Sequence, residues 1–224
     1  MEDERMNKII QQALSEGRKH LSENEVKQVL KDFEIPTTDF QYFHDLSEVD
    51  FDKLKFPVAL KICSPNILHK TDVGGVVLNI QKREELTKHA DQMKNKFPGE
   101  GLLVEPMYKG LVEVIIGLIN DATFGLTIMF GIGGIYTEVY KDVTFRVIPI
   151  QRTDAEEMLT ELRASPILEG ARKIKIDKEK LVQMILKTSE FANANSKIID
   201  QMDLNPVFLT EDSVRAVDAK LILR

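Results

Sequence analysis

The segment between Val58 and Ile80 constrains the fold more than any other part of the chain. Its first five residues, VALKI, alternate in the two-residue period of a β-strand. A loop carrying His69 and Lys70 follows, then the pair Gly74–Gly75, then a second apolar strand. Two lysines, a histidine and a flexible backbone therefore gather where an anion with several oxygens, such as a phosphate, would fit.

The order of the predicted elements favours an α+β fold. Apolar spacing indicates helices before Pro36, at residues 83–96, near residues 153–162 and after Asp177. Strands are expected at residues 102–105, 112–119, 126–130, 137–150, 203–209 and 214–223. Because helices and strands do not follow a simple strand–helix–strand rhythm, we expect two α+β lobes, residues 1–102 and residues 103–224.

Composition excludes several classes of protein. The 224 residues are 43% hydrophobic, enough for a substantial core. A formal net charge of -6 argues against general nucleic-acid binding, which needs a basic surface. The single cysteine, Cys63, rules out an internal disulfide and favours a reducing location. No signal peptide is seen, and no apolar run reaches the roughly 18 residues of a membrane helix. We expect a cytoplasmic protein with no nucleic-acid or membrane partner.

Lys61 and His69 are the residues of the first segment that suggest chemistry. Lys61 sits on an otherwise apolar strand, so its ammonium must reach water, a carboxylate or a bound anion. An edge-strand lysine with its head in solvent is an equally good interpretation. A loop histidine is more often a surface residue, but a neutral imidazole between two lysines can attack a phosphoryl group. The segment lacks the GxxxxGK[ST] pattern and is not a P-loop.

Two glutamates flank the predicted turn PMYKG. Glu105 and Glu113 could accept hydrogen bonds from an adenine amino group or from ribose hydroxyls. From spacing alone, two solvent-facing carboxylates are the better interpretation. The later glycines Gly131, Gly133 and Gly134 match no dinucleotide fingerprint, and a tight turn near the active cleft is expected there.

The last two strands allow a geometric prediction. If they form a hairpin turning at Glu211–Asp212, counting outward places Asn205 opposite Asp218. Directly opposed side chains have Cβ atoms roughly 5 Å apart and share a face. A carboxylate and an amide oxygen at that spacing suit Mg²⁺, although a simple hydrogen-bonded pair is the alternative. Asp203 should point the same way and pair across to Lys220, as a ligand through water or as an ion-pair partner.

Three stretches together resemble a known family. HKTDVGGV, FGIGGIYTEVYKDVTFRVIP and MDLNPV are similar to the ATP-grasp subunit of ADP-forming acyl-CoA synthetases (acetate–CoA ligases) and, more distantly, to the β subunit of succinyl-CoA synthetase. The resemblance runs from about residue 20 to the C-terminus. It implies an ATP-grasp fold, with ATP or ADP held between the two α+β lobes.

The resemblance also implies roles for particular residues. Lys61 matches a lysine that holds nucleotide phosphates, and Lys70 falls in the phosphate loop. Glu105 matches a hinge residue near adenine, in a hinge that includes Met107 and Tyr108. The remaining matches are the ribose-binding Glu113, the magnesium ligands Asn205 and Asp218, and the phosphate-accepting His69. The succinyl enzyme has glutamate where Asp203 stands, so the resemblance gives Asp203 no role.

The implied reaction is acyl-CoA + ADP + phosphate to acid + CoA + ATP, in both directions, by way of phosphohistidine. The chain contains no CoA-binding module, so the resemblance implies a separate α subunit that carries the other phosphorylatable histidine, in an α₂β₂ complex. Two alternatives remain at this point. One is a nucleotide-sensing subunit without catalysis. The other is a different ATP-grasp ligase.

Overall fold

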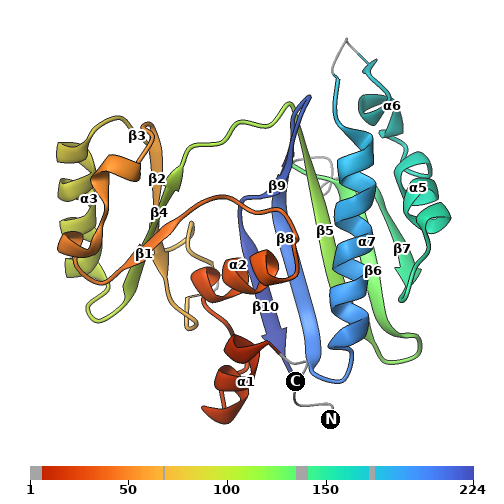
Figure 1. The fold of residues 1–224 in the computed structure, drawn as a ribbon, viewed down its shortest axis with the longest axis horizontal. Coiled ribbons are helices and arrows are strands. Elements are labelled where there is room, and N and C mark those ends of the chain that lie inside the picture. Colours follow the sequence, from red (N-terminus) through yellow and green to blue (C-terminus); the bar gives the residue numbers. More distant parts are fainter. Residues whose placement is uncertain (1–6, 68, 135–140, 172–174) are drawn as a thin grey trace. The chain divides into compact units, whose positions relative to one another are not determined.

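The computed structural model describes residues 7–67, 69–134, 141–171 and 175–224 (Figure 1). It divides the chain into two compact units. The smaller unit comprises Ser22–Glu25 and Thr38–Tyr108, and the larger unit comprises Met1–Leu21, Val26–Thr37 and Lys109–Arg224. This division differs from the predicted one after residue 102. The early helices bury their apolar faces in the core of the larger unit, and the strand that follows residue 100 completes the smaller sheet.

The smaller unit is an antiparallel sheet covered by one helix. Among its described residues the strand order is β1 (Gln41–Phe43), β4 (Gly101–Pro106), β2 (Val58–Cys63) and β3 (Val76–Ile80). Helix α3 (Arg83–Lys96) lies along this sheet (Figure 1) and buries Leu86, Ala90 and Met93, which are spaced for one helical face. Two short 3₁₀ helices, η2 (Leu46–Glu48) and η3 (Phe51–Lys53), lie in the loop before β2.

The larger unit is a six-stranded antiparallel sheet with helices packed on it. The described strands run in the order β10 (Ala219–Leu223), β8 (Ile199–Leu209), β5 (Val112–Asp121), β6 (Gly125–Ile132) and β7 (Val143–Val147), and β9 (Val214–Ala216) pairs with β8. Helix α7 (Lys178–Ala194) packs along the sheet (Figure 1), with Asp177 as its N-cap, as predicted. The described residues also form α1 (Lys8–Ser15), α2 (Glu23–Asp32), α5 (Arg152–Thr160) and α6 (Ser165–Leu168), of which the first turn of α2 belongs to the smaller unit.

The C-terminal hairpin has the predicted register. Val207 pairs with Ala216 and Lys220 pairs with Asp203, which are the partners obtained by counting outward from Glu211–Asp212. The predicted second strand is split into β9 and β10. The buried positions change parity on both sides of this break, from Leu204 to Val207 on β8 and from Ala216 to Ala219 on the partner side.

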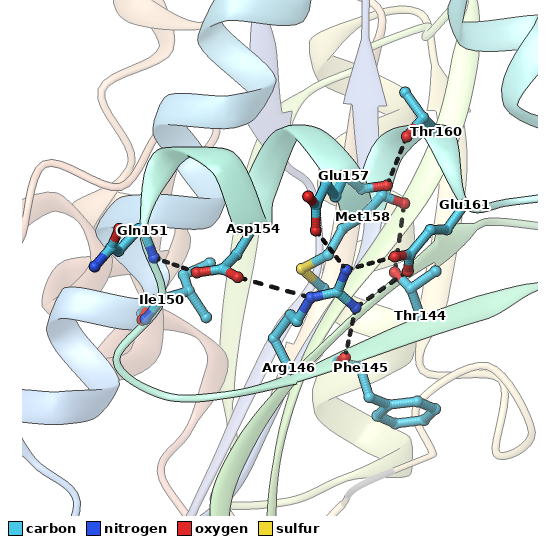
Figure 2. Close-up of polar contacts among 11 residues, drawn as sticks. Thr144, Phe145, Arg146, Ile150, Gln151, Asp154, Glu157, Met158, Thr160 and Glu161 are labelled. Atoms are coloured by element: carbon cyan, nitrogen blue, oxygen red, sulfur yellow. Dashed lines mark hydrogen bonds and ion pairs between the residues drawn. The ribbon is translucent and has the colours of Figure 1, made fainter.

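Arg146 on β7 forms ion pairs with glutamates in and just after helix α5. The guanidinium of Arg146 lies 2.6 Å from Oε1 of Glu161 and 3.3 Å from Oε2 of Glu157 (Figure 2). Both glutamates are solvent-exposed and Arg146 is only partly buried, so each pair contributes only about 0.2–1 kcal/mol. Of the predicted strand 137–150, only Val143–Val147 is a strand (β7) among the described residues, and residues 137–140 lie outside the described part of the chain.

Candidate functional site

Lys61 lies at an inner position of the smaller sheet. Strand β2 runs between β4 and β3, and all six of its residues are buried. Lys61 itself is 5% exposed. The interpretation of Lys61 as an edge-strand lysine with its ammonium in solvent is therefore wrong, and its charge must be met inside the protein.

Two carboxylates form ion pairs with the ammonium group of Lys61. The Nζ atom of Lys61 lies 2.8 Å from Oε1 of Glu23 and 2.6 Å from Oε1 of Glu105. The Nζ atom of Lys70 pairs with Oε2 of the same Glu23. Thr38 donates a hydrogen bond to Oε2 of Glu105. We call Glu23, Lys61, Lys70 and Glu105 the buried ion cluster, because each of the four is at most 7% exposed.

Sequence reasoning misinterpreted one member of this cluster, Glu105, and overlooked another, Glu23. Glu105 is 1% exposed, so the interpretation of it as a solvent-facing carboxylate is wrong. Sequence reasoning missed Glu23 altogether. Its position in the first turn of α2, between Ser22 and Glu25 with their capping-box spacing S-x-x-E, is that of an ordinary acidic helix start. Nothing in the spacing indicates that its side chain turns inward to two lysines.

The loop after β2 brings a buried and an exposed residue side by side. Lys70 is buried, whereas His69 is exposed. The glycine pair is hydrogen-bonded to earlier residues of the same loop. Gly74 N–H donates to Thr71 O, and Gly75 N–H donates to Lys70 O. Both N–H groups are therefore used within the loop.

The predicted hinge lies at the end of the smaller unit. Met107 and Tyr108 follow β4 and are both partly buried. The N–H of Met107 donates to Pro57 O at 2.9 Å, which ties the hinge to the start of β2. Tyr108 is the last residue of the smaller unit, and Lys109 begins the larger one.

Glu113 belongs to the larger unit. It is exposed on β5, on the face opposite to Val112 and Val114, which point into the core. Gly133 packs directly on it: the Gly133 N–H donates to Glu113 O at 2.7 Å, and a Cβ at position 133 would lie 3.1 Å from Glu113 Cβ. The glycines after β6 thus allow the backbone to approach Glu113 closely. The motif residues Ile135–Tyr140 lie outside the described residues.

Asn205 and Asp218 face each other at the break between β9 and β10. The N–H of Asn205 donates to Asp218 O at 3.1 Å, and Oδ1 of Asp218 accepts from Ala219 N–H at 2.8 Å. Asn205 is exposed and Asp218 is partly buried. The two residues therefore lie where the buried alternation is interrupted, between Leu204 and Val207 on β8 and between Ala216 and Ala219 on the partner side.

Asp203 lies next to this pair. It is in register with Lys220, as predicted. Burial raises the pKa of Asp203, the ammonium of Lys220 opposes that rise, and the nearby Asp218 carboxylate adds to it. Asp203 and Asp218 are thus close enough for their charges to interact.

The described residues place the predicted site residues in two groups. The smaller unit holds Lys61, Lys70, Glu105, Met107, Tyr108 and His69, and the larger unit holds Glu113, Asn205 and Asp218. In the described part of the chain, no helix is long and apolar enough to cross a membrane.

Comparison with known proteins assigns this arrangement to a family. A family model described as an ATP-grasp domain matches residues 12–223. The chain belongs to the ATP-grasp family. Within that family it is 44% identical, over 97% of both chains, to subunit beta of acetate–CoA ligase [ADP-forming] II from Pyrococcus furiosus. It is 42% identical, over 96% of both chains, to subunit beta of ligase I from the same organism. The predicted family and fold class are confirmed.

Solved structures agree with this assignment. A crystal structure from Pyrococcus horikoshii Ot3 matches with a TM-score of 0.90 and 41% identity, covering 96% of both chains. The dinucleotide forming acetyl-coenzyme A synthetase 1 of Ca. Korarchaeum cryptofilum, solved with coenzyme A and Mg-AMPPCP, matches with a TM-score of 0.85 and 38% identity. The match covers 96% of this ATP-grasp chain and 98% of that one. In that Korarchaeum structure, the phosphohistidine segment points towards the nucleotide binding site.

Proposed function

We propose that this chain is the nucleotide-binding β subunit of an ADP-forming acyl-CoA synthetase. The complete enzyme converts acyl-CoA, ADP and phosphate into a carboxylic acid, CoA and ATP, and runs in both directions. The observation that carries the proposal is the 44% identity over 97% of both chains with a β subunit named for this reaction. The buried lysines of the smaller unit give the proposal its chemistry.

Within the proposal, Lys61 and Lys70 bind nucleotide phosphates. Their ammonium groups neutralise the charge that the phosphoryl oxygens carry during transfer, which is the main source of catalysis in phosphoryl transfer. Glu105 holds Lys61 and lies two residues before Met107, in the segment assigned to the base. Glu113, exposed on β5, is assigned to the ribose hydroxyls.

Asn205 and Asp218 fit a magnesium ion by their chemistry. Hard cations prefer oxygen ligands, and Mg²⁺ takes one or two from the protein together with phosphate oxygens and water. The hydrogen bond from Ala219 N–H fixes one oxygen of the Asp218 carboxylate. Among the described residues, no three His, Cys, Asp or Glu side chains gather as a ligand set, which suits a metal that binds together with nucleotide. Such an ion would supply additional positive charge to the phosphates.

His69 is the proposed phosphate acceptor. Its exposure leaves the imidazole accessible to a partner, and its neighbour Lys70 belongs to the buried ion cluster. In ATP synthesis, the bond between phosphorus and the His69 nitrogen breaks as the terminal ADP oxygen bonds to that phosphorus.

The proposed partner is a CoA-binding α subunit with its own phosphorylatable histidine, in an α₂β₂ complex in the cytoplasm. The naming of both Pyrococcus furiosus relatives as beta subunits supports a separate partner. The chain also matches 34% of the length of acetate–CoA ligase [ADP-forming] I from Archaeoglobus fulgidus. A longer protein therefore carries this module together with further sequence.

The test uses the complex reconstituted with the CoA-binding subunit. His69→Ala is expected to lower ATP formation at least about 100-fold, because the phosphoryl carrier is lost. Mg-ADP affinity of the variant should stay within about twofold of the wild type, since the lysines are untouched. His89→Ala, a histidine on α3, is the matched control and should keep its turnover.

Radiolabelled ATP separates catalysis from nucleotide sensing. The wild-type chain should acquire an acid-labile phosphate from the γ position of ATP, and His69→Ala should not. Undiminished turnover in His69→Ala would rule out the phosphohistidine role. A wild-type chain that binds ATP without becoming labelled would favour a sensing subunit.

A further inference from the structure

Glu23 divides its carboxylate between the two lysines of the proposed phosphate site. Oε1 pairs with Lys61 at 2.8 Å and Oε2 pairs with Lys70. The Glu23 side chain is only 2% exposed. Its place in the first turn of α2 suits a negative charge, because the N-terminal end of a helix carries a partial positive charge.

Sharing one carboxylate forces the two ammonium groups close together. Each is within hydrogen-bond or ion-pair distance of an oxygen of the same group, so both charges sit in one small, buried volume. Two like charges in such a place disfavour each other's protonated form unless an anion lies between them. Glu23 provides that anion.

Stability alone does not account for the arrangement. Buried ion pairs contribute little net stability, because desolvation of the charges offsets their attraction. The cluster therefore places two charged lysines in one spot at no evident gain for folding. Clusters of this kind are concentrated at functional sites, where a protonation state has to be maintained.

We propose that Glu23 is a positioning residue, which holds Lys61 and Lys70 side by side and keeps both protonated for phosphate binding. The inference rests on the proposed function, since it deepens the role of those two lysines. Glu23 acts through the lysines and does not itself contact the phosphate.

Other charged or titratable groups near Glu23 set the conditions of the test. Glu105 on β4 faces Lys61, and the Cys63 thiol on β2 interacts with both Glu23 and Lys70. Burial raises the pKa of Cys63 to about 12, so that thiol keeps one state over the pH range used. The exposed His69 precedes Lys70, and the buried Lys27 follows Glu23 by one helical turn.

The experiment is the pH dependence of Mg-ADP binding to the full chain, from pH 7 to pH 10, by calorimetry. The wild type should keep its affinity up to the ordinary range of lysine, about 10.4. Glu23→Gln should lose affinity about 1–3 pH units earlier, because one ammonium loses its proton without the anion. At pH 9 its Kd should then be at least about tenfold above its own value at pH 7.

Two further variants isolate the role of the charge. Glu84→Gln removes an exposed first-turn glutamate from α3 in the same unit and should bind like the wild type across the range. Glu23→Asp keeps the charge and should restore most of the alkaline affinity. A purely structural role of Glu23 would weaken binding equally at all pH values and would not move the pH at which affinity is lost.

The outcomes separate the inference from the proposed function. A wild-type chain that binds no Mg-ADP overturns both. A wild type that binds, together with a Glu23→Gln profile unchanged in its alkaline part, overturns the role of Glu23 alone. If Glu23→Gln fails to fold, lysine Nζ resonances of the wild type decide. Both ammonium groups should stay protonated over the pH range in which the wild type binds Mg-ADP, and loss of either proton within that range contradicts the role of Glu23.

Discussion

At the scale of single residues, the buried lysines of the smaller unit pair with carboxylates far away in the sequence. Lys61 lies between the carboxylates of Glu23 and Glu105. Glu23 could not be found from spacing, because its partners lie 38 and 47 positions further along the chain. Pairs between residues so far apart in the sequence depend on the tertiary fold and are not encoded in any local pattern.

Asp45 gives a pH-dependent prediction at this scale. Its pKa is lowered to about 2, first by the backbone N–H of Ser47 and then by Lys94. A lowered pKa stabilises the fold above the unfolded value of about 3.9, and this contribution is lost as pH falls toward 2. Asp45→Asn should therefore lower stability at pH 7 and flatten the fall in stability between about pH 4 and pH 2.

Chemical denaturation at a series of pH values measures this effect. Asp52→Asn, which removes an exposed carboxylate from the same loop, is the control and should follow the wild-type curve. An Asp45→Asn curve parallel to the wild type down to pH 2 would show that the Ser47 and Lys94 contacts contribute nothing in solution.

At the scale of secondary structure, local pattern predicted most elements. Helix α3 has the predicted bounds 83–96, and α7 begins after Asp177 as expected. The hairpin register was also predictable, since a short turn fixes which residues oppose each other. The break between β9 and β10 was not, because it coincides with a register shift between β8 and β5, where Val114 pairs with Val207 but Ile116 pairs with Leu204. Strand β1, only Gln41–Phe43, is too short to show a period.

The loop after β2 gives a prediction at the same scale. A Cβ on Gly75 would lie 2.4 Å from Cγ2 of Ile62, inside a well-packed region. Gly75→Ala should therefore destabilise the protein by about 1–3 kcal/mol, as overpacking usually does. Urea denaturation measures the change. The cost should shrink when Ile62→Ala is already present, because the clashing methyl is gone. An equal cost in both backgrounds would mean that Ile62 is not the cause.

At the scale of the whole molecule, the family resemblance predicted more of the fold and function than composition and element order did. Composition and element order supported two α+β units, but they could not assign the early helices to the larger unit, because that assignment depends on which core buries them. The proposals for the partner subunit and for the reaction rest on the relatives alone, since the acid and CoA are expected to bind to the partner.

Binding of ADP to the purified chain, measured by calorimetry with and without Mg²⁺, tests the central claim most directly. The account predicts one ADP per chain and a clear gain in affinity with Mg²⁺. That gain should disappear in Asp218→Asn and persist in Asp200→Asn, an exposed carboxylate on the same hairpin. A chain that binds no ADP at millimolar concentration, or an Asp218→Asn variant that responds to Mg²⁺ like the wild type, would contradict the account.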